Sequence, residues 1–76
     1  MEYKNWLITQ IASEASIAVE EVDCDVTFDQ FNLDSLAIVS ISFEMESQFQ
    51  LENVDPSLFS EYNTINKLCV WLENQQ

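Results

Sequence analysis

The stretch Phe31-Asn32-Leu33-Asp34-Ser35-Leu36 combines a helix start with the beginning of a long apolar run. Asp34 is a typical N-cap residue, because its carboxylate can accept hydrogen bonds from the free amides of the first turn. Ser35 then falls at the first helical position. The apolar residues behind it suffice for a helix of about three to four turns, from Ser35 to Gln48 or Gln50. The sequence therefore predicts one hydroxyl at the positive end of a helix, where the dipole and the free amides stabilise a phosphate.

The composition around this stretch favours a small helical domain. The chain has 76 residues, of which 47% are hydrophobic, with no glycine and one proline. Hairpin turns need glycine or asparagine at positive φ, so helices are favoured over hairpins. The length allows one small core. We predict an all-α fold in which residues 1–76 form a single domain.

The charge of the chain is strongly negative. The formal net charge is −12, and Lys4 and Lys67 are the only cationic side chains. This argues against nucleic-acid binding, which needs cations against the phosphates, and against binding to an anionic membrane. The sequence has neither an apolar run that approaches a membrane span nor a basic leader followed by an apolar run. The lack of both predicts a cytoplasmic chain. Because the chain begins with methionine and has no flanking linker, we expect a free-standing protein, with an excised domain of a larger protein as the alternative. We also expect a monomer that meets basic protein surfaces.

The residues before the central stretch predict one helix and one loop. Helical periodicity favours a first helix from about Glu2 to Ser16. From Ile17 to Leu33 the periodicity fades, and apolar residues are scattered between acidic ones. A loop of this length is unusual in a compact domain and often carries function.

The residues after the central helix predict a short helix and a longer one. Asp55 is expected to be the N-cap of a third helix over Pro56–Glu61, with proline at the first helical position. Thr64 is the expected N-cap of a fourth helix that ends near Asn74. The predicted architecture is therefore a small four-helix bundle, with three main helices, one short third helix and a long first loop.

The central helix carries apolar residues on two nearly opposite faces. One face must pack on the domain, and it comprises Ile38, Ile41, Ser42, Met45 and Phe49. Leu36, Val39 and Phe43 lie on the other face, flanked by Glu44 and Glu46. An apolar centre with a charged rim is the usual anatomy of a protein-docking surface. We therefore predict docking through this second face, with burial of both faces as the alternative.

The sequence gives little support for catalysis or for a metal site. A Ser-His-Asp relay is excluded because the chain has no histidine. One acidic series matches positions 1, 3, 5, 7 and 12 of a calcium-binding EF-hand loop: Asp23, Asp25, Thr27, Asp29 and Asp34. The sixth position, however, is Phe28 where the sharp turn needs glycine. Cys24 and Cys69 have no metal-site spacing, and both are expected to be reduced. We predict neither an enzyme nor a metal protein.

The motif Asn32-Leu33-Asp34-Ser35-Leu36 resembles the attachment motif of acyl carrier proteins, usually Gly-Leu-Asp-Ser-Leu. The resemblance implies a 4'-phosphopantetheine group attached covalently to Ser35. It also implies that Asp34 orients the motif and lies near the metal and phosphate during modification. Asn32 replaces the family's glycine, and asparagine is the residue that tolerates left-handed backbone best after glycine.

A second segment, Asp55 to Ile65, is similar to the end of polyketide-synthase carrier domains. Those domains have a Leu-Phe pair, an aromatic residue and Pro-Thr-Ile in this order, and here Asn63 replaces the proline. The resemblance implies an acyl carrier that holds intermediates as thioesters. Its implied partners are a phosphopantetheinyl transferase, an acyltransferase or ligase for loading, and a ketosynthase or other biosynthetic enzymes.

Two alternatives remain open. A peptidyl or aminoacyl carrier uses the same arm, although its usual motif has Gly-Gly where this chain has Asn32-Leu33. An unmodified acidic helical interaction module is the alternative from a different functional class.

Overall fold

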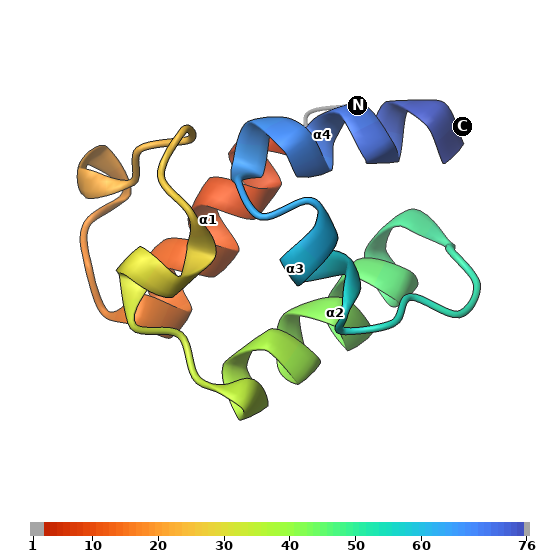
Figure 1. Ribbon diagram of the computed structural model, residues 1–76, viewed down its shortest axis with the longest axis horizontal. Helices are drawn as coiled ribbons and strands as arrows, with labels where there is room; N and C mark the ends of the chain where they lie inside the picture. The colour runs from red at the N-terminus through yellow and green to blue at the C-terminus, as the bar shows by residue number, and fades with distance from the viewer. Residues whose placement is uncertain (1–2, 76) are drawn as a thin grey trace.

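The computed structural model describes residues 3–75 as four α-helices and two short 3₁₀ turns (Figure 1). The helices are α1 (Tyr3–Ala15), α2 (Ser35–Phe49), α3 (Leu58–Glu61) and α4 (Ile65–Gln75). Within these residues there is no strand, and an isolated bridge joins Thr27 to Thr64. The prediction of an all-α bundle with one short third helix is confirmed. None of the described helices is long and apolar enough to cross a membrane.

The two longest helices end in the same way. Ser16 follows α1 with φ 59°, and the Ile17 amide donates to the Ala12 carbonyl over 3.0 Å. Gln50 follows α2 with φ 55°, and the Leu51 amide donates to the Glu46 carbonyl over 3.0 Å. A left-handed residue followed by such a bond is the Schellman motif, which glycine usually closes. The predicted end at Ser16 lies one residue too far, and the predicted start at Glu2 lies outside the described residues.

The first loop is more regular than its sequence suggested. It contains the 3₁₀ turns η1 (Val19–Glu21) and η2 (Phe28–Phe31). Two backbone bonds tie it to the second half of the chain, from the Phe28 amide to the Asn63 carbonyl (3.0 Å) and from the Asn66 amide to the Cys24 carbonyl (3.2 Å). Turns of three or four residues are too short to produce a hydrophobic period, so no sequence pattern predicted them.

The third helix begins two residues later than predicted. Asp55 Oδ1 accepts from the Ser57 amide over 2.9 Å, so the start signal is real. This bond, followed by one from the Ser57 hydroxyl, lowers the pKa of the Asp55 carboxyl. Pro56 and Ser57 form a turn, and regular helix follows only from Leu58.

The fourth helix starts where the sequence predicted. Thr64 Oγ1 accepts from the Lys67 amide over 3.1 Å, which confirms Thr64 as its N-cap. The helix ends at Gln75, one residue beyond the predicted end.

The core lies where α1, α2 and α4 meet, with α3 between α2 and α4 in the view of Figure 1. Its fully buried large side chains are Leu7, Ile11, Ile41, Met45, Ile65, Leu68 and Leu72. At one end Tyr3 and Trp6 each pack edge-on against Phe49, with ring centroids 5.0 Å apart. Trp6 therefore covers the edge of the core. Cys69 is buried and Cys24 is partly buried.

Candidate functional site

Asp34 fixes the start of α2. Its backbone is extended (φ −88°, ψ 178°), and its side chain accepts from the Ala37 amide over 2.8 Å. Its carbonyl accepts from the Ile38 amide over 3.1 Å, the first bond of the helix. The N-cap prediction is therefore confirmed, and Ser35 is the first helical residue.

The Ser35 side chain is exposed beside free backbone amides. The amides of Ser35 and Leu36 lie too early in the helix to have an intrahelical carbonyl partner. Together with the helix dipole they favour an anionic group at this end. The site therefore fits a phosphate attached to Ser35 Oγ, since the amides lie next to the attachment point and Asp34 already caps Ala37.

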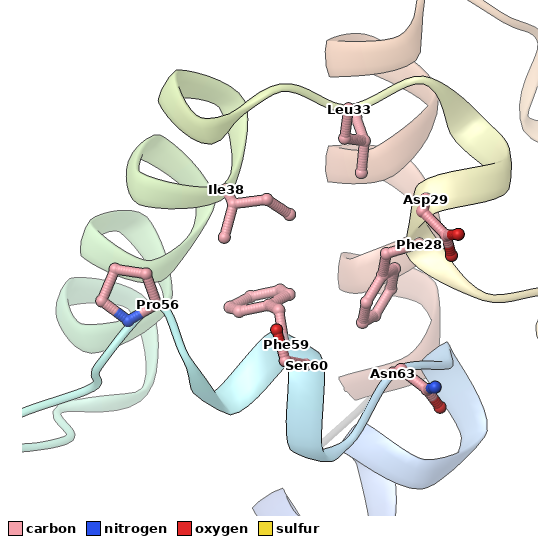
Figure 2. Close-up of a pocket in the computed structure, with 8 residues that line it drawn as sticks. All are labelled: Phe28, Asp29, Leu33, Ile38, Pro56, Phe59, Ser60 and Asn63. Carbon is pink, nitrogen blue, oxygen red and sulfur yellow. The ribbon is translucent and has the colours of Figure 1, made fainter.

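The turn before the site depends on Asn32. This residue has left-handed backbone, with φ 58° and ψ 34°, and its amide donates to the Asp29 carbonyl over 3.3 Å. The backbone conformation explains why asparagine can stand where glycine is usual. Leu33 then points inward, toward Phe28 (Figure 2).

The predicted docking face of α2 is open to solvent over much of its length. Leu36 is 78% exposed and Phe43 is 64% exposed, whereas Val39 between them is partly buried. These positions recur at three- and four-residue spacing and therefore share one side of the helix. Such exposure rules out the alternative in which both faces are buried. We call Leu36, Val39 and Phe43 the α2 patch.

The opposite face of α2 is buried with one exception. Ala37, Ile41, Ser42, Met45 and Phe49 are buried, and the Ser42 hydroxyl donates to the Val39 carbonyl over 2.8 Å. Ile38 was assigned to this face, but it is only partly buried. It lies at the edge of the face, where it lines the groove described below.

The two glutamates beside the α2 patch differ in their contacts. Glu44 is exposed. Glu46 is partly buried, and its Oε1 accepts from the Val54 amide over 2.7 Å. Glu46 thus anchors the loop that follows α2. Because its partner lies eight residues away in an irregular segment, the helical pattern alone did not show this bond.

A groove between α2 and α3 leads away from Ser35. One cavity of about 370 Å³ lies at its mouth, lined by Ser35, Val39 and Ser57 among others. A second, of about 330 Å³, lies deeper and is lined by Phe28 and Phe59. Both are lined by Leu33, Ile38, Pro56 and Ser60, so the groove is continuous. In Figure 2 the side chains of Phe28, Leu33, Ile38 and Phe59 point toward one another, which makes its inner part apolar.

No sequence pattern predicted this groove. Phe28 and Phe59 lie 31 positions apart in the chain, yet their rings are tilted against each other with centroids 5.2 Å apart. Neither residue belongs to the central helix, and no local pattern relates them. The one sequence feature that could have indicated the groove is the presence of apolar residues at intervals along the first loop.

The acidic side chains of the first loop do not come together to form a metal-ion site among the described residues. Asp23 Oδ1 accepts from the Asp25 amide over 2.9 Å, and Asp25 Oδ1 accepts from the Asn66 side-chain amide. Across residues 3–75 no three potential metal-ligating side chains come together. The two thiols are not activated either, because burial is the main cause that raises the pKa of both Cys24 and Cys69.

Comparison with known sequences finds one family that matches most of the chain. Residues 5–72 match the family described as phosphopantetheine attachment site. The chain is 32% identical over 71 residues to Polyketide synthase PksL of Bacillus subtilis, covering 93% of this chain and 2% of that protein. It is 40% identical over 63 residues to Non-reducing polyketide synthase adaA of Aspergillus niger, covering 83% of this chain and 4% of that protein. The chain thus spans a small fraction of either relative.

Among solved structures the chain is similar to a free-standing peptidyl carrier protein from a secondary metabolic pathway of Acinetobacter baumannii. The TM-score is 0.90 and the sequence identity is 32%. The match covers 96% of this chain and 90% of that one, so the two share the whole bundle.

Proposed function

The chain belongs to the phosphopantetheine-attachment-site family, and from this premise we propose that it is an acyl carrier protein modified on Ser35. Members of this family carry a 4'-phosphopantetheine group on a serine and are themselves non-catalytic. The observation that supports Ser35 most strongly is its exposed position as the first residue of α2, directly after the N-cap Asp34.

Modification requires Ser35 Oγ to reach a second enzyme, a phosphopantetheinyl transferase. There Oγ attacks the β-phosphate of coenzyme A, a phosphodiester bond forms, and the adenosine bisphosphate leaves. The proton from Oγ passes to a base of the transferase, because this chain has no histidine and no basic group beside Ser35. The chain contributes the presentation of the hydroxyl, through the cap of Asp34, and two free amides that favour the phosphodiester product.

The arm, when attached, supplies a terminal thiol that holds the cargo as a thioester. We propose that an apolar acyl chain rests in the groove between α2 and α3 while it is not with an enzyme. The groove starts beside Ser35 and is apolar at its inner end, where Phe28 and Phe59 lie. The residues of the protein that line the groove thus bind the acyl cargo and limit its contact with water.

Partner enzymes are proposed to bind the α2 patch, with Glu44 and Glu46 on its rim. The patch starts next to Ser35, so an enzyme that covers it can receive the arm in its active site. A small apolar surface with a charged rim suits brief, specific encounters. Suitable partners are a loading acyltransferase or ligase and a ketosynthase or related enzyme, each with basic groups around an apolar contact.

We propose that the chain takes part in polyketide biosynthesis. We also propose that it is a cytoplasmic monomer with a single domain. This is supported by the two relatives named as polyketide synthases and by the similarity of Asp55–Ile65 to carrier domains of such synthases. A second candidate is a peptidyl carrier, because the similar solved structure is a free-standing peptidyl carrier protein.

The experiment that tests the carrier function is modification of the purified protein. The folded protein is incubated with coenzyme A, Mg²⁺ and a broad-specificity phosphopantetheinyl transferase, and its intact mass is measured. We expect a gain of one phosphopantetheine group. No gain in a sample that is folded by circular dichroism would leave an unmodified interaction module as the remaining function.

Loading of the modified protein then distinguishes an acyl carrier from a peptidyl carrier. It is offered in parallel to a malonyl-transferring enzyme with malonyl-coenzyme A and to amino-acid-adenylating enzymes with ATP. We expect thioester formation with the malonyl donor. Loading only by an adenylating enzyme would instead assign the chain to the peptidyl carriers.

A further inference from the structure

A third cavity lies on the far side of η2 from the groove. It has a volume of about 380 Å³ and lies between the end of α1 and the first loop. Phe28 and Asp29 of η2 line the groove, whereas Gln30 and Phe31 of the same turn line this cavity. We call it the loop crevice. It ends at Asn32, three positions before Ser35, and it uses no residue of the α2 patch.

The loop crevice has an apolar floor and an acidic rim. Ile17, Val26 and Phe31 form the floor, and each is only partly buried. Glu21 and Asp23 stand at the rim, both exposed, and no cationic residue lines the cavity. Glu20 and Asp25 lie within two positions of them in the chain, so carboxylates are concentrated here, and Lys4 is the cation whose charge acts on the neighbouring Cys24.

The two rim carboxylates are held in fixed positions. Glu21 Oε1 accepts from the Ala18 amide over 2.9 Å, and Asp23 Oδ1 accepts from the Asp25 amide over 2.9 Å. Each bond uses one oxygen and leaves the other for a ligand. A group that binds here therefore meets acceptors that are already oriented, which lowers the entropic cost of binding.

We propose that the loop crevice binds an arginine side chain of an enzyme that acts on the arm at Ser35. The alkyl part of arginine covers Ile17 and Val26, its guanidinium plane lies against the Phe31 ring, and its N–H groups donate to Glu21 and Asp23. This inference rests on the proposed function. A partner that binds both the α2 patch and the loop crevice contacts the chain on both sides of Ser35. The carboxylates at the rim of the crevice then let the partner distinguish this carrier from carriers that lack them.

The test uses a small probe, because the partner enzyme is unidentified. Acetyl-arginine amide is titrated into the full-length, ¹⁵N-labelled protein and followed by NMR, with acetyl-citrulline amide as the neutral isostere. We expect saturable shifts at Ile17, Val26 and Phe31 with the arginine probe and none with the citrulline probe. In Glu21→Gln/Asp23→Asn the apparent affinity is expected to fall about tenfold or more.

These variants preserve the local fold, because glutamine and asparagine retain the oxygen that accepts from Ala18 and Asp25. Glu14→Gln/Glu73→Gln is the matched control, since both glutamates are exposed and neither lines the crevice. Equal shifts around Glu14 and Glu73, or an affinity that the rim variant leaves unchanged, would overturn the proposal. Failure of the carrier function is recognised separately, because it leaves the mass unchanged after incubation with coenzyme A.

Discussion

At the scale of single residues, we propose two separable roles for Asp34. Its carboxylate caps α2 through the Ala37 amide, and its negative charge lies next to the proposed attachment serine. The first role requires only an acceptor oxygen, whereas the second requires the charge. Substitutions that keep one property and remove the other can therefore separate them.

We predict that Asp34→Ala lowers the free energy of unfolding by about 1 kcal/mol, because the cap is lost. Asp34→Asn keeps an acceptor for the Ala37 amide and should change stability by less. Both variants should slow modification by the transferase, since both lose the charge. Urea unfolding and the initial rate of the mass gain measure the two effects. Normal modification of Asp34→Asn would show that the carboxylate acts only as a cap.

Left-handed residues are a second feature at this scale. Ser16, Asn32, Gln50 and Asn53 have positive φ, in a chain without glycine. Serine and glutamine with a Cβ atom are strained in this region, whereas asparagine is tolerated. The ends of α1 and α2 therefore carry strain that a glycine would relieve.

Gln50→Gly is predicted to raise the free energy of unfolding by about 0.5–1 kcal/mol, because Gln50 already has the conformation that glycine prefers. Ser13→Gly is the control. Ser13 is exposed inside α1, where glycine should instead cost about 0.5 kcal/mol. Thermal and urea unfolding of both variants check the pair, and a loss of stability in Gln50→Gly would contradict the role given to the left-handed cap.

At the scale of elements, the two sides of α2 differ in burial. Its inner side packs in the core through residues such as Ile41 and Met45, which are fully buried. Its outer side carries the α2 patch beside Ser35, the proposed attachment site. The division of α2 into a buried face and an exposed face was predicted from the helical spacing, because one face of a helix in so small a bundle must remain exposed to solvent. The prediction that Ile38 is buried was wrong. The burial of a residue at the edge of a face depends on the neighbouring helix, and the position of α3 could not be predicted from the sequence.

Phe43→Ala should leave stability within about 0.5 kcal/mol of the wild type, because the side chain is largely exposed. It should nevertheless reduce the transfer of cargo to a partner enzyme. Met45→Ala, two positions later on the buried side, should cost about 2–5 kcal/mol. Urea unfolding and kcat/KM for transfer distinguish the two. Strong destabilisation by Phe43→Ala would place Phe43 in the core.

The short elements show the limit of local patterns. The starts of α2 and α4 were predicted from Asp34 and Thr64, because an N-cap acts within three residues. The turns η1 and η2 were missed, since they are held by contacts with distant residues such as Asn63. The groove was missed for the same reason, because Phe28 and Phe59 meet only in the folded chain.

At the scale of the whole molecule, most of the described acidic side chains are exposed, whereas Cys69 is buried and Cys24 is partly buried. Cys69 lies in the core, and burial is the main cause that raises the pKa of its thiol. In the unfolded chain the thiol ionises near its ordinary pKa of about 8.5. Above that pH the unfolded state has lost a proton that the folded state keeps, so the stabilisation from neutral Cys69 is lost as the pH rises through the folded pKa.

The difference in free energy of unfolding between the wild type and Cys69→Ala should therefore shrink between pH 7 and pH 10. Urea unfolding at several pH values measures it, and the comparison cancels the titration of the tyrosines and lysines. A difference that stays constant would mean that the thiol has the same pKa in both states.

We propose that phosphopantetheine is attached to Ser35. On this proposal the carrier function of the whole molecule depends on one hydroxyl, which the start of α2 positions. Ser57 offers a matched control, because it lines the same cavity mouth and is also exposed.

The most direct measurement is tandem mass spectrometry of the protein after treatment with coenzyme A and a phosphopantetheinyl transferase, alongside Ser35→Ala and Ser57→Ala. We expect that the group maps to Ser35, that Ser57→Ala is modified like the wild type, and that Ser35→Ala remains folded and unmodified. A group found on another serine, or a folded Ser35→Ala protein that still gains it, would show that Ser35 is not the attachment site.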